Sequence, residues 1–500
     1  ALGFAALDAA ILPSSNTSIG SASLSVNVHS SRNTAVGSNS LESHNLGSAG
    51  NGLNTAVGYN SGLAVTTGLQ NTLIGANAGD ALTDADFNIA IGTDALGGDT
   101  LGSRSIAIGR RALLTQNFTT ATDAYNTAVG FEAGHNITTS TFNTLIGGLS
   151  GDALTVGNKN TALGYNTLST DTKGDRNVAI GTDALGTQNF TTSTDSYNTA
   201  VGFTAGGAIT TGVQNTFVGG LAGDAATTRD GNTAVGYSAL TADAKGLGSV
   251  AVGSSALASQ NYGTDTNAFN TGVGYFAGAA ITTGVQNTII GAIAGDALTD
   301  ADNNTALGYV ALGQCVLGSS NTAVGSGSLF ACNPATAVSM FNTAVGADAG
   351  NAVTTGIRNV LVGGLSGDSF TDADFNTAIG TSALTADTLG SRSVAVGDSA
   401  LGSQNFTTAT DPYNVGVGYN SGGSVTTGIF NTLIGGLAGD ALTDADSNVA
   451  VGLNALSSDT LGSKSTAIGQ AALFTQNFTT AAESHNTAVG FEAGGAVTTG

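Results

Sequence analysis

The chain of 500 residues has no tryptophan, one methionine, two cysteines and three prolines, and only 9% of its residues are charged. Positive charge is the scarcest, because 12 Lys and Arg stand against 34 Asp and Glu and leave a net charge of −22. Proteins that bind nucleic acid present a basic stripe, so the sequence disfavours that class. The chain also lacks the run of about 18 apolar residues that a membrane-spanning helix needs, so we expect no membrane contact within this segment.

Glycine is abundant instead, with 75 residues, and a five-residue pattern recurs from end to end, as in Asn54-Thr55-Ala56-Val57-Gly58. All 27 copies have Gly at the fifth position and Val, Ile or Leu at the fourth, and the first residue is Asn in 23 copies and Ser in four. From Asn54 onward, successive copies begin 17, 17, 17 and 21 residues apart, which gives a larger unit of 72 residues. A fixed period of this kind is the signature of a repeat architecture.

The short step between copies leaves no room for a pair of helices. Val, Ile and Thr dominate the short alternating spans and favour strands, and the Gly, Asn, Asp and Ser residues between the spans favour turns. The sequence therefore predicts an all-β fold, a parallel β-solenoid or β-roll of about 27 stacked coils, with two or three short strands in each coil. No linker interrupts the pattern, so we expect one continuous solenoid over residues 1–500, cut from a longer array.

The invariant positions have predicted structural roles in such a stack. The Asn side chains are expected to form a ladder from coil to coil, Gly at the fifth position permits a turn or a close approach, and the fourth position is expected to fill the interior or a packed face. The residues predicted to form this structural ladder are Asn54, Val57, Gly58, Asn71, Ile74 and Gly75.

Both faces of the repeated strand carry apolar side chains, because the third position is also apolar, usually Ala and once per unit a larger residue such as Leu73. Neighbouring strand residues point to opposite faces, and only one face of a thin solenoid can line its core. We therefore expect another chain to cover the outer face, in a homotrimer or a bundle of fibres. The alternative is a flat roll whose outer face carries small residues.

Cys315 and Cys332 are one short step apart and occupy the same place in adjacent coils. Stacked equivalents lie within reach of a disulfide, so the spacing predicts a Cys315–Cys332 bridge and an oxidising, extracellular compartment. Two free thiols are the alternative. Five other units have Asp and Gln at the two positions, namely Asp99/Gln116, Asp171/Gln188, Asp243/Gln260, Asp387/Gln404 and Asp459/Gln476.

A recurring Asp-Ala-Asp-x-Asn segment offers alternating oxygen atoms, in the way that calcium-binding loops begin. Asp84, Asp86 and Asn88 are the candidate ligands for Ca²⁺ in its first occurrence. The segment lacks the Gly and the distant Glu of a complete calcium loop, so a turn in which Asp bonds the local backbone is the alternative reading. No other cofactor is expected.

The four extra residues of each 21-residue step form a predicted loop, and an aromatic residue at its end is followed six residues later by another. The functional reading is a row of loops that contacts a receptor, a glycan or a neighbouring fibre; in the alternative reading each pair packs over its own loop. The pairs are Tyr125/Phe131, Tyr197/Phe203, Phe269/Tyr275 and Tyr413/Tyr419.

The sequence gives no support for catalysis. The four histidines, at positions 29, 44, 135 and 485, are scattered, and none lies with a Cys, a Ser-Asp pair or a second His at a repeated offset. We therefore predict that the protein is not an enzyme. The regular Thr residues, such as Thr55, leave an ice-binding face as a remote hypothesis.

The Asn-Thr-Ala-Val-Gly strand, followed by small residues such as Ala95-Leu96 or Ala133-Gly134, resembles the head repeats of trimeric autotransporter adhesins, and is similar to repeats in phage tail fibres. The resemblance covers nearly the whole chain. It implies a left-handed parallel β-roll, a three-fold fibre and a surface-exposed location. The leading functional hypothesis is therefore an extracellular fibre or adhesin segment at a cell surface, and the alternative is the receptor-binding tail fibre shaft of a bacteriophage. An ice- or glycan-binding solenoid is the third hypothesis.

Overall fold

The computed structural model describes residues 1–11 and 14–500 and shows a parallel β-solenoid. No helix occurs in the described residues, so none there could cross a membrane. The chain forms two compact units, residues 1–248 with 263–265, and residues 249–262 with 266–500. The all-β fold of stacked short coils is thus confirmed, whereas left-handedness and a single continuous solenoid stay predictions.

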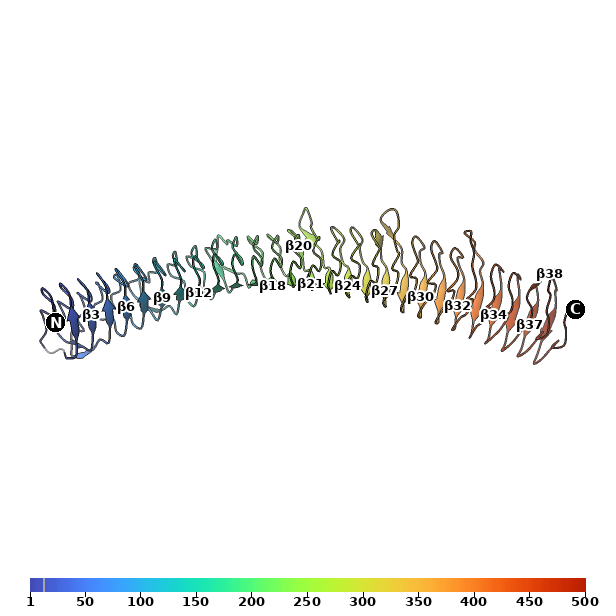
Figure 1. The fold of residues 1–500 in the computed structure, drawn as a ribbon, viewed down its shortest axis with the longest axis horizontal. Coiled ribbons are helices and arrows are strands. Elements are labelled where there is room, and N and C mark those ends of the chain that lie inside the picture. The colour runs from blue at the N-terminus through green and yellow to red at the C-terminus, as the bar shows by residue number, and fades with distance from the viewer. Residues whose placement is uncertain (12–13) are drawn as a thin grey trace. The chain divides into compact units, whose positions relative to one another are not determined.

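Each coil of the first unit contributes one strand of three residues to a parallel sheet, and Figure 1 shows several of them as a row of arrows. Leu2 also pairs with Ile19, so a further turn of chain lies beside the first strand. The strands are β1 (Thr17–Ile19), β3 (Thr34–Val36), β5 (Thr55–Val57), β6 (Thr72–Ile74), β7 (Ile89–Ile91), β9 (Ile106–Ile108), β11 (Thr127–Val129), β12 (Thr144–Ile146), β13 (Thr161–Leu163), β15 (Val178–Ile180), β17 (Thr199–Val201), β18 (Thr216–Val218) and β19 (Thr233–Val235).

The second unit follows the same plan. Its three-residue strands are β21 (Val250–Val252), β23 (Thr271–Val273), β24 (Thr288–Ile290), β25 (Thr305–Leu307), β27 (Thr322–Val324), β29 (Thr343–Val345), β30 (Val360–Val362), β31 (Thr377–Ile379), β32 (Val394–Val396), β33 (Val415–Val417), β34 (Thr432–Ile434), β35 (Val449–Val451), β37 (Thr466–Ile468) and β39 (Thr487–Val489).

In the described part of the chain, further strands of two residues occur only near the 21-residue steps, where a parallel pair such as β8 and β10 joins the end of the inserted loop to the preceding coil. Most coils therefore have one short strand joined by corners, and the prediction of two or three strands in each coil was wrong. The two-residue strands are β2 (Ser30–Ser31), β4 (Gly50–Asn51), β8 (Gly102–Ser103), β10 (Thr122–Asp123), β14 (Gly174–Asp175), β16 (Thr194–Asp195), β20 (Gly246–Leu247), β22 (Thr266–Asn267), β26 (Gly318–Ser319), β28 (Val338–Ser339), β36 (Gly462–Ser463) and β38 (Ala482–Glu483).

Sequence-equivalent residues face each other in the sheet, as Thr55 faces Thr72 between β5 and β6. The opening Asn residues link the coils: Asn54 Oδ1 accepts hydrogen bonds from the backbone N–H of Asn71 (2.9 Å) and from its side-chain Nδ2 (3.2 Å). The Asn71 Nδ2 group also donates to the carbonyl of Ala85 (2.8 Å). The Asn ladder thus satisfies buried backbone groups of two successive corners, which are costly to leave unpaired.

Glycine at the fifth position is required by both conformation and space. Gly58 has φ +141°, and a Cβ atom placed on it would lie 2.3 Å from the carbonyl oxygen of Gly75. Gly75, with φ +136°, meets Gly92 in the same way. The close stacking of one coil on the next therefore excludes any side chain here.

The third position of each strand lines the core, and the second and fourth positions lie on the outer face. Ala56 and Leu73 have no exposed surface, whereas Val57 is half-buried and Ile74 is 37% exposed. Of the two places predicted for the fourth position, the interior and a packed face, Val57 and Ile74 do not take the interior, because alternation along the strand sends the third residue inward. That another chain packs on this face stays a prediction.

Core packing accounts for part of the 72-residue period. Leu73 fills space next to two glycines, since a Cβ atom on Gly62 or on Gly79 would lie 2.7 or 2.8 Å from its methyl groups. The next two coils have Ala at the third position and a buried leucine, Leu96 or Leu113, where Gly62 and Gly79 stand. Large and small residues thus exchange places between coils and keep the interior filled.

Candidate functional site

The residue before each opening Asn or Ser forms a row along one corner of the coils. In the described residues these positions have a left-handed backbone, with φ values such as 62° at Phe87, 63° at Arg104 and 61° at Phe142. A non-glycine residue in this conformation is uncommon and costs about 1 kcal/mol or more. The row therefore presents outward-facing side chains at a place where glycine would be easier to accommodate, and it repeats with every coil.

Aromatic and cationic side chains stack on each other in this row. The Arg104 guanidinium lies 4.8 Å from the ring centroid of Phe87 and 5.7 Å from that of Tyr125. Tyr125 stacks on Phe142 with centroids 5.6 Å apart. Each such contact contributes about 0.5–1 kcal/mol at an exposed site. The second unit has a similar row at Arg358, Phe375, Arg392, Tyr413 and Phe430.

The alternative reading, in which each aromatic pair packs over its own loop, does not hold at Tyr125. Tyr125 stacks on Phe142 of the next coil, and not on Phe131, which lies beside Arg110 at 5.6 Å. The inserted loop is held by Phe118 instead, which is only 5% exposed. The predicted partners failed because the stacking direction runs from coil to coil, so side chains that are one coil step apart in the sequence meet.

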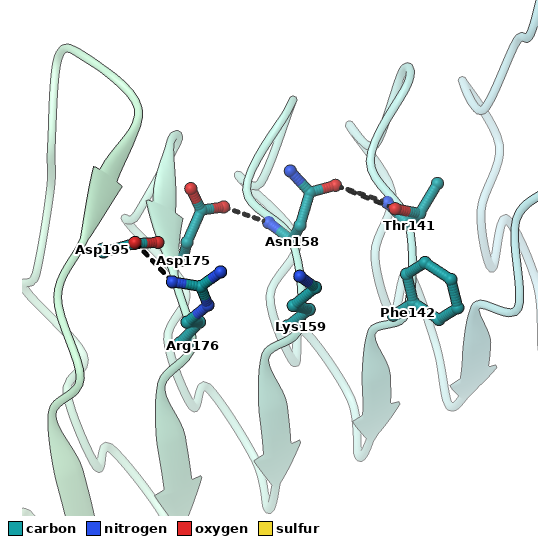
Figure 2. A pocket seen from close by; sticks show the side chains of 7 residues that line it. All are labelled: Thr141, Phe142, Asn158, Lys159, Asp175, Arg176 and Asp195. Atoms are coloured by element: carbon teal, nitrogen blue, oxygen red, sulfur yellow. Dashed lines mark hydrogen bonds and ion pairs between the residues drawn. The ribbon is translucent and has the colours of Figure 1, made fainter.

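A surface pocket of about 260 Å³ opens beside this row in the first unit (Figure 2). Its walls come from four successive coils, and the side chains follow one another along the direction of stacking. Its lining residues are Thr141, Phe142, Asn158, Lys159, Asp175, Arg176 and Asp195.

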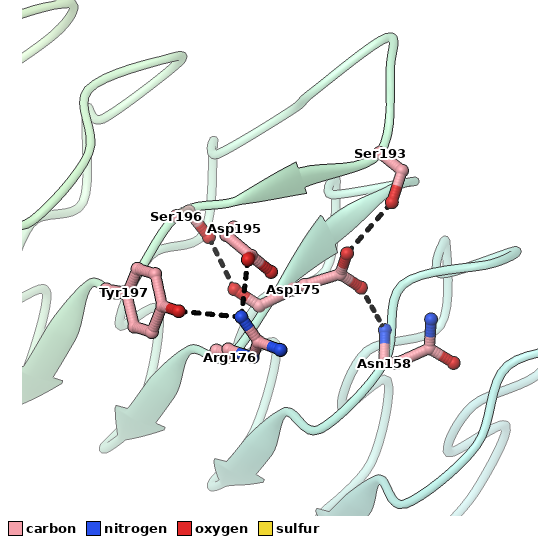
Figure 3. Close-up of polar contacts among 7 residues, drawn as sticks. All are labelled: Asn158, Asp175, Arg176, Ser193, Asp195, Ser196 and Tyr197. Carbon is pink, nitrogen blue, oxygen red and sulfur yellow. Dashed lines mark hydrogen bonds and ion pairs between the residues drawn. The ribbon is translucent and has the colours of Figure 1, made fainter.

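Hydrogen bonds fix most of the polar side chains around the pocket (Figure 3). Asp175, 8% exposed, accepts hydrogen bonds from the backbone N–H of Asn158 and from the Ser193 hydroxyl (2.9 Å). Arg176 forms an ion pair with Asp195, and its Nη1 group also donates to the Tyr197 hydroxyl (2.6 Å). The hydrogen bond to Tyr197 is the largest of the effects that raise the pKa of Arg176. The walls of the pocket are therefore held in place without a ligand.

The side chain of Asn158 is also engaged. Its Oδ1 atom accepts hydrogen bonds from the Thr141 backbone N–H (2.8 Å) and hydroxyl (3.2 Å), and its Nδ2 group donates to the Val156 carbonyl (2.9 Å). Lys159 is exposed, and among the described residues no acid pairs with its ammonium group. Lys159 is thus the group in the pocket with the most unused hydrogen-bonding capacity.

A second polar cluster lies inside the solenoid, where the Asp and Gln positions noted in the sequence meet. The Asp99 carboxylate is fully buried and accepts hydrogen bonds from the Gly102 N–H (3.0 Å), the Phe118 N–H (3.2 Å) and Gln116 Nε2 (2.6 Å). Gln116 Oε1 accepts in turn from Asn126 Nδ2 (2.9 Å). The pair therefore connects the start of the inserted loop to the Asn ladder.

This network engages both oxygens of the buried carboxylate. Burial raises the pKa of Asp171 and of Asp387, and the hydrogen bonds from Gln188 and Gln404 oppose the shift. A fully buried carboxylate whose two oxygens both accept hydrogen bonds from the chain is already satisfied within the fold. The geometry therefore favours a structural role for these acids.

The Cys315 and Cys332 side chains occupy the same interior place and are joined by a disulfide, with Cα atoms 4.5 Å apart. Both are fully buried, and Met340 lies against Cys332. The disulfide thus links adjacent coils at the point where other units use a hydrogen-bonded Asp and Gln.

His44 stands at this repeated place too, a relation that the sequence reading missed. It is fully buried, its Nε2 atom lies 2.8 Å from the Ser30 hydroxyl, and burial lowers its pKa to about 4. Asn27, in the preceding coil, takes the place of Asp99 in that unit. Counting one 72-residue unit back from Gln116 to His44 is the signal that would have found it.

The candidate calcium ligands do not converge on one point. The Asp84 carboxylate accepts a hydrogen bond from the Thr67 hydroxyl, Asp86 Oδ1 accepts from the Leu69 N–H (2.7 Å), and Asn88 is fully buried in the Asn ladder. In the described part of the chain, no three His, Cys, Asp or Glu residues are placed to hold a metal ion. Both carboxylates bond residues of the preceding coil, 17 positions earlier, and not their own local backbone. These contacts favour a structural link between coils, and calcium binding stays an untested hypothesis.

Comparison with known proteins adds no further constraint, because the chain matches no protein-family model and no curated protein significantly. The β-solenoid fold is the part of the resemblance to adhesin heads and phage fibres that the structure bears out, and anything finer about family membership is a proposal.

Proposed function

We propose that this chain is a non-catalytic, extracellular fibre segment that associates with further copies of itself through the outer face of its sheet. The observation that carries the proposal is the composition of that face. Among all 27 copies the second position is Thr, Val or Ile and the fourth is Val, Ile or Leu, with no charged residue at either.

The face stays partly exposed within each unit. Ile74 is 37% exposed, Leu163 43% and Ile434 39%. Rows of exposed apolar side chains of this kind mark interaction surfaces in soluble proteins. Nothing in the packing of a single coil requires an aliphatic residue at the partly exposed fourth position, so its presence in every copy supports a role in association.

A second copy of the chain is the partner that fits this face. Stacked strands are separated by about 4.8 Å, and a chain with the same coil step can match this spacing coil for coil. The face is neutral while the chain carries a net charge of −22, so two copies can approach there without bringing their acidic residues together. The predicted homotrimer or fibre bundle is one such assembly.

The test is a mass measurement on the whole chain and on a charged variant. We expect the wild-type chain to have the mass of two or more copies of 48.6 kDa each. The triple variant Ile74→Lys, Ile91→Lys, Ile108→Lys is expected to dissociate, because like charges would face each other across the interface. The control is Thr119→Lys, Thr120→Lys, Ala121→Lys in an exposed loop. A wild-type monomer at micromolar concentration would refute self-association.

The proposed setting is a bacterial cell-surface adhesin, and the alternative is a phage tail fibre shaft. Both need a stiff segment with mechanical and adhesive roles, and cooperative stacking between neighbouring coils supplies this in repeat proteins. The flanking gene sequence distinguishes the two: a secretion signal with a membrane anchor supports the adhesin, and a virion attachment domain supports the shaft.

Ice binding is a second candidate, because one observation favours it. Thr55 and Thr72 point outward in register on β5 and β6, and not toward the core. A regular outward Thr row is what an ice-binding face needs. Thermal hysteresis of the dissociated chain, lost on Thr55→Lys with Thr72→Lys, would support this function, and its absence would exclude it.

A further inference from the structure

The pocket in the first unit interrupts the row of stacked side chains described above. At the equivalent place in two other 72-residue repeats, an arginine guanidinium lies over a phenylalanine ring. These are Arg104 over Phe87 and Arg392 over Phe375, both 4.8 Å from the ring centroid. In the pocket the matching residues are Arg176 and Lys159, so a second cation replaces the aromatic ring. Figure 2 shows Lys159 between Arg176 and Phe142.

Two cations on successive coils are unfavourable neighbours unless an anion lies near both. The neighbouring acids do not provide an anionic partner for the Lys159 ammonium group. Asp195 is paired with Arg176, and Asp175 is turned to Asn158 and Ser193. The chain is acidic overall, with a net charge of −22, so a pair of adjacent cations with one left unpaired is a local exception.

Other differences from the repeat gather around the same pocket. Four polar residues differ from those at the equivalent positions of most other 72-residue repeats. Thr141 replaces Leu, Val or Ile, Asn158 replaces Asp, Asp175 replaces Ser, and Ser193 replaces Ala. All four belong to the hydrogen-bond network that shapes the walls. Changes scattered by drift would not be expected to meet in one network.

The unused groups define the chemistry of a ligand. Lys159 offers an ammonium group, and the Nε and Nη2 groups of Arg176 make no hydrogen bond among the described residues, since its ion pair and its bond to Tyr197 both use Nη1. Phe142 offers a ring that is 51% exposed and is backed by Tyr125. A ligand with an anionic oxygen group next to a flat C–H face would satisfy the two cations and pack on the aromatic ring.

We propose that this pocket binds a carboxylated saccharide, with the carboxylate between Lys159 and Arg176 and one face of the sugar ring on Phe142. Asp195 holds Arg176 in place, and the exposed surroundings allow a longer glycan to continue along the row. This deepens the adhesive part of the proposed function and rests on it, because it names the class of surface molecule that the fibre would bind.

The test compares binding of carboxylated and neutral oligosaccharides by isothermal titration calorimetry. The probes are sialyllactose and an oligogalacturonate, with lactose as the neutral control. We expect at least one acidic probe to bind and lactose to bind about tenfold more weakly or not at all, because a charge-assisted contact is lost. Equal binding of lactose, or no binding of either acidic probe at millimolar concentration, would overturn the proposal.

Repeat-guided variants separate binding from folding. Lys159→Phe restores the residue found at Phe87 and Phe375, so we expect it to fold normally and to lose affinity about tenfold or more. Arg392→Gln removes a cation that lies over Phe375 in the other compact unit and should change affinity less than about twofold. Unchanged binding by Lys159→Phe would overturn the site. The mass of each variant is measured in parallel, so failure of the saccharide site is distinguishable from failure of self-association.

Discussion

The inner and outer faces of the sheet are built by alternate residues of the same strands. In β6, Leu73 is fully buried, whereas its neighbour Ile74 is 37% exposed. The inner face varies from coil to coil, between Ala, Gly, Ser, Leu, Ile and Phe, and nearby glycines make room for the larger residues. The outer face varies much less, although it is less buried. The comparison teaches that packing within the chain constrains the inner face through volume, and that the uniform outer face needs a cause outside a single chain.

The inner contact between coils is the most sensitive place to break this comparison. Gly58→Val would place a Cβ atom 2.3 Å from the Gly75 carbonyl oxygen in a backbone conformation with φ +141°. We expect a loss of about 4 kcal/mol in the free energy of unfolding, because steric overlap adds to backbone strain. Amide hydrogen exchange of β5 and β6 measures the effect coil by coil. Unchanged protection there would show that the close approach is not needed.

The two faces of β6 can be compared directly with matched truncations. Leu73→Ala should lower the free energy of unfolding by about 3 kcal/mol, because it leaves a cavity beside Gly62 and Gly79. Ile74→Ala removes a similar volume from the outer face and should cost about 1 kcal/mol or less in the dissociated chain. Denaturant unfolding of both variants provides the measurement. Equal losses would contradict the assignment of faces.

The buried Cys pair of one 72-residue repeat can be exchanged for the Asp and Gln pair of the others. Reduction of the Cys315–Cys332 disulfide should lower the free energy of unfolding by about 3 kcal/mol, since the bridge closes a short loop of a single coil. The double variant Cys315→Asp, Cys332→Gln installs the pair used elsewhere and should recover part of this loss through hydrogen bonds. Alkylation before reduction, followed by mass analysis, provides the control. Two modified thiols at that stage would show that no bridge forms.

A more local effect is a pH dependence confined to the first coils. Burial lowers the pKa of His44 from 6.5 to about 4. Its stabilising contribution is therefore present above pH 6.5 and is lost as the pH falls through about 4, a change of about 3 kcal/mol at most. His44→Gln should remove the dependence, because Gln occupies this place in other units. Hydrogen exchange of the first coils between pH 4 and 7 tests this.

Asp171 provides the opposite sign as an internal check. Burial raises its pKa, so its contribution to stability is largest below the unfolded pKa of about 3.8 and falls as the pH rises through the folded pKa. Its coils should not lose protection from Asp171 when the pH is lowered toward 4. A parallel loss of protection around His44 and Asp171 would contradict these shifts.

The sequence was sufficient to predict the coil step, the all-β class and the stacking of equivalent residues, because these follow from the spacing of Asn54 and Asn71 and from strand-forming residues. It could not assign the faces, since Ala56 and Val57 are both apolar and only the direction of the strand decides which points inward. Whether each coil had one strand or more was also beyond it, because the corners contain the same residues as strands.

The sites show the same division. The place of Cys315 and Cys332 in adjacent coils followed from counting the coil step. The equivalence of His44 and Gln116 was harder to recognise, because the two side chains are chemically unlike. The stacking of Tyr125 on Phe142 depends on left-handed corner residues that no local pattern indicates. The pocket at Lys159 was not predicted because its walls come from four coils, and only their side-by-side arrangement brings the differences together.

An electron cryomicroscopy map of the assembled chain in cross-section would show directly whether a second copy covers the outer face of the sheet. We expect the face formed by residues such as Val57 and Ile74 to be covered by the same face of another copy, with the Asn ladder inside each solenoid. A map of single chains, or of an assembly in which this face is open to solvent, would contradict it.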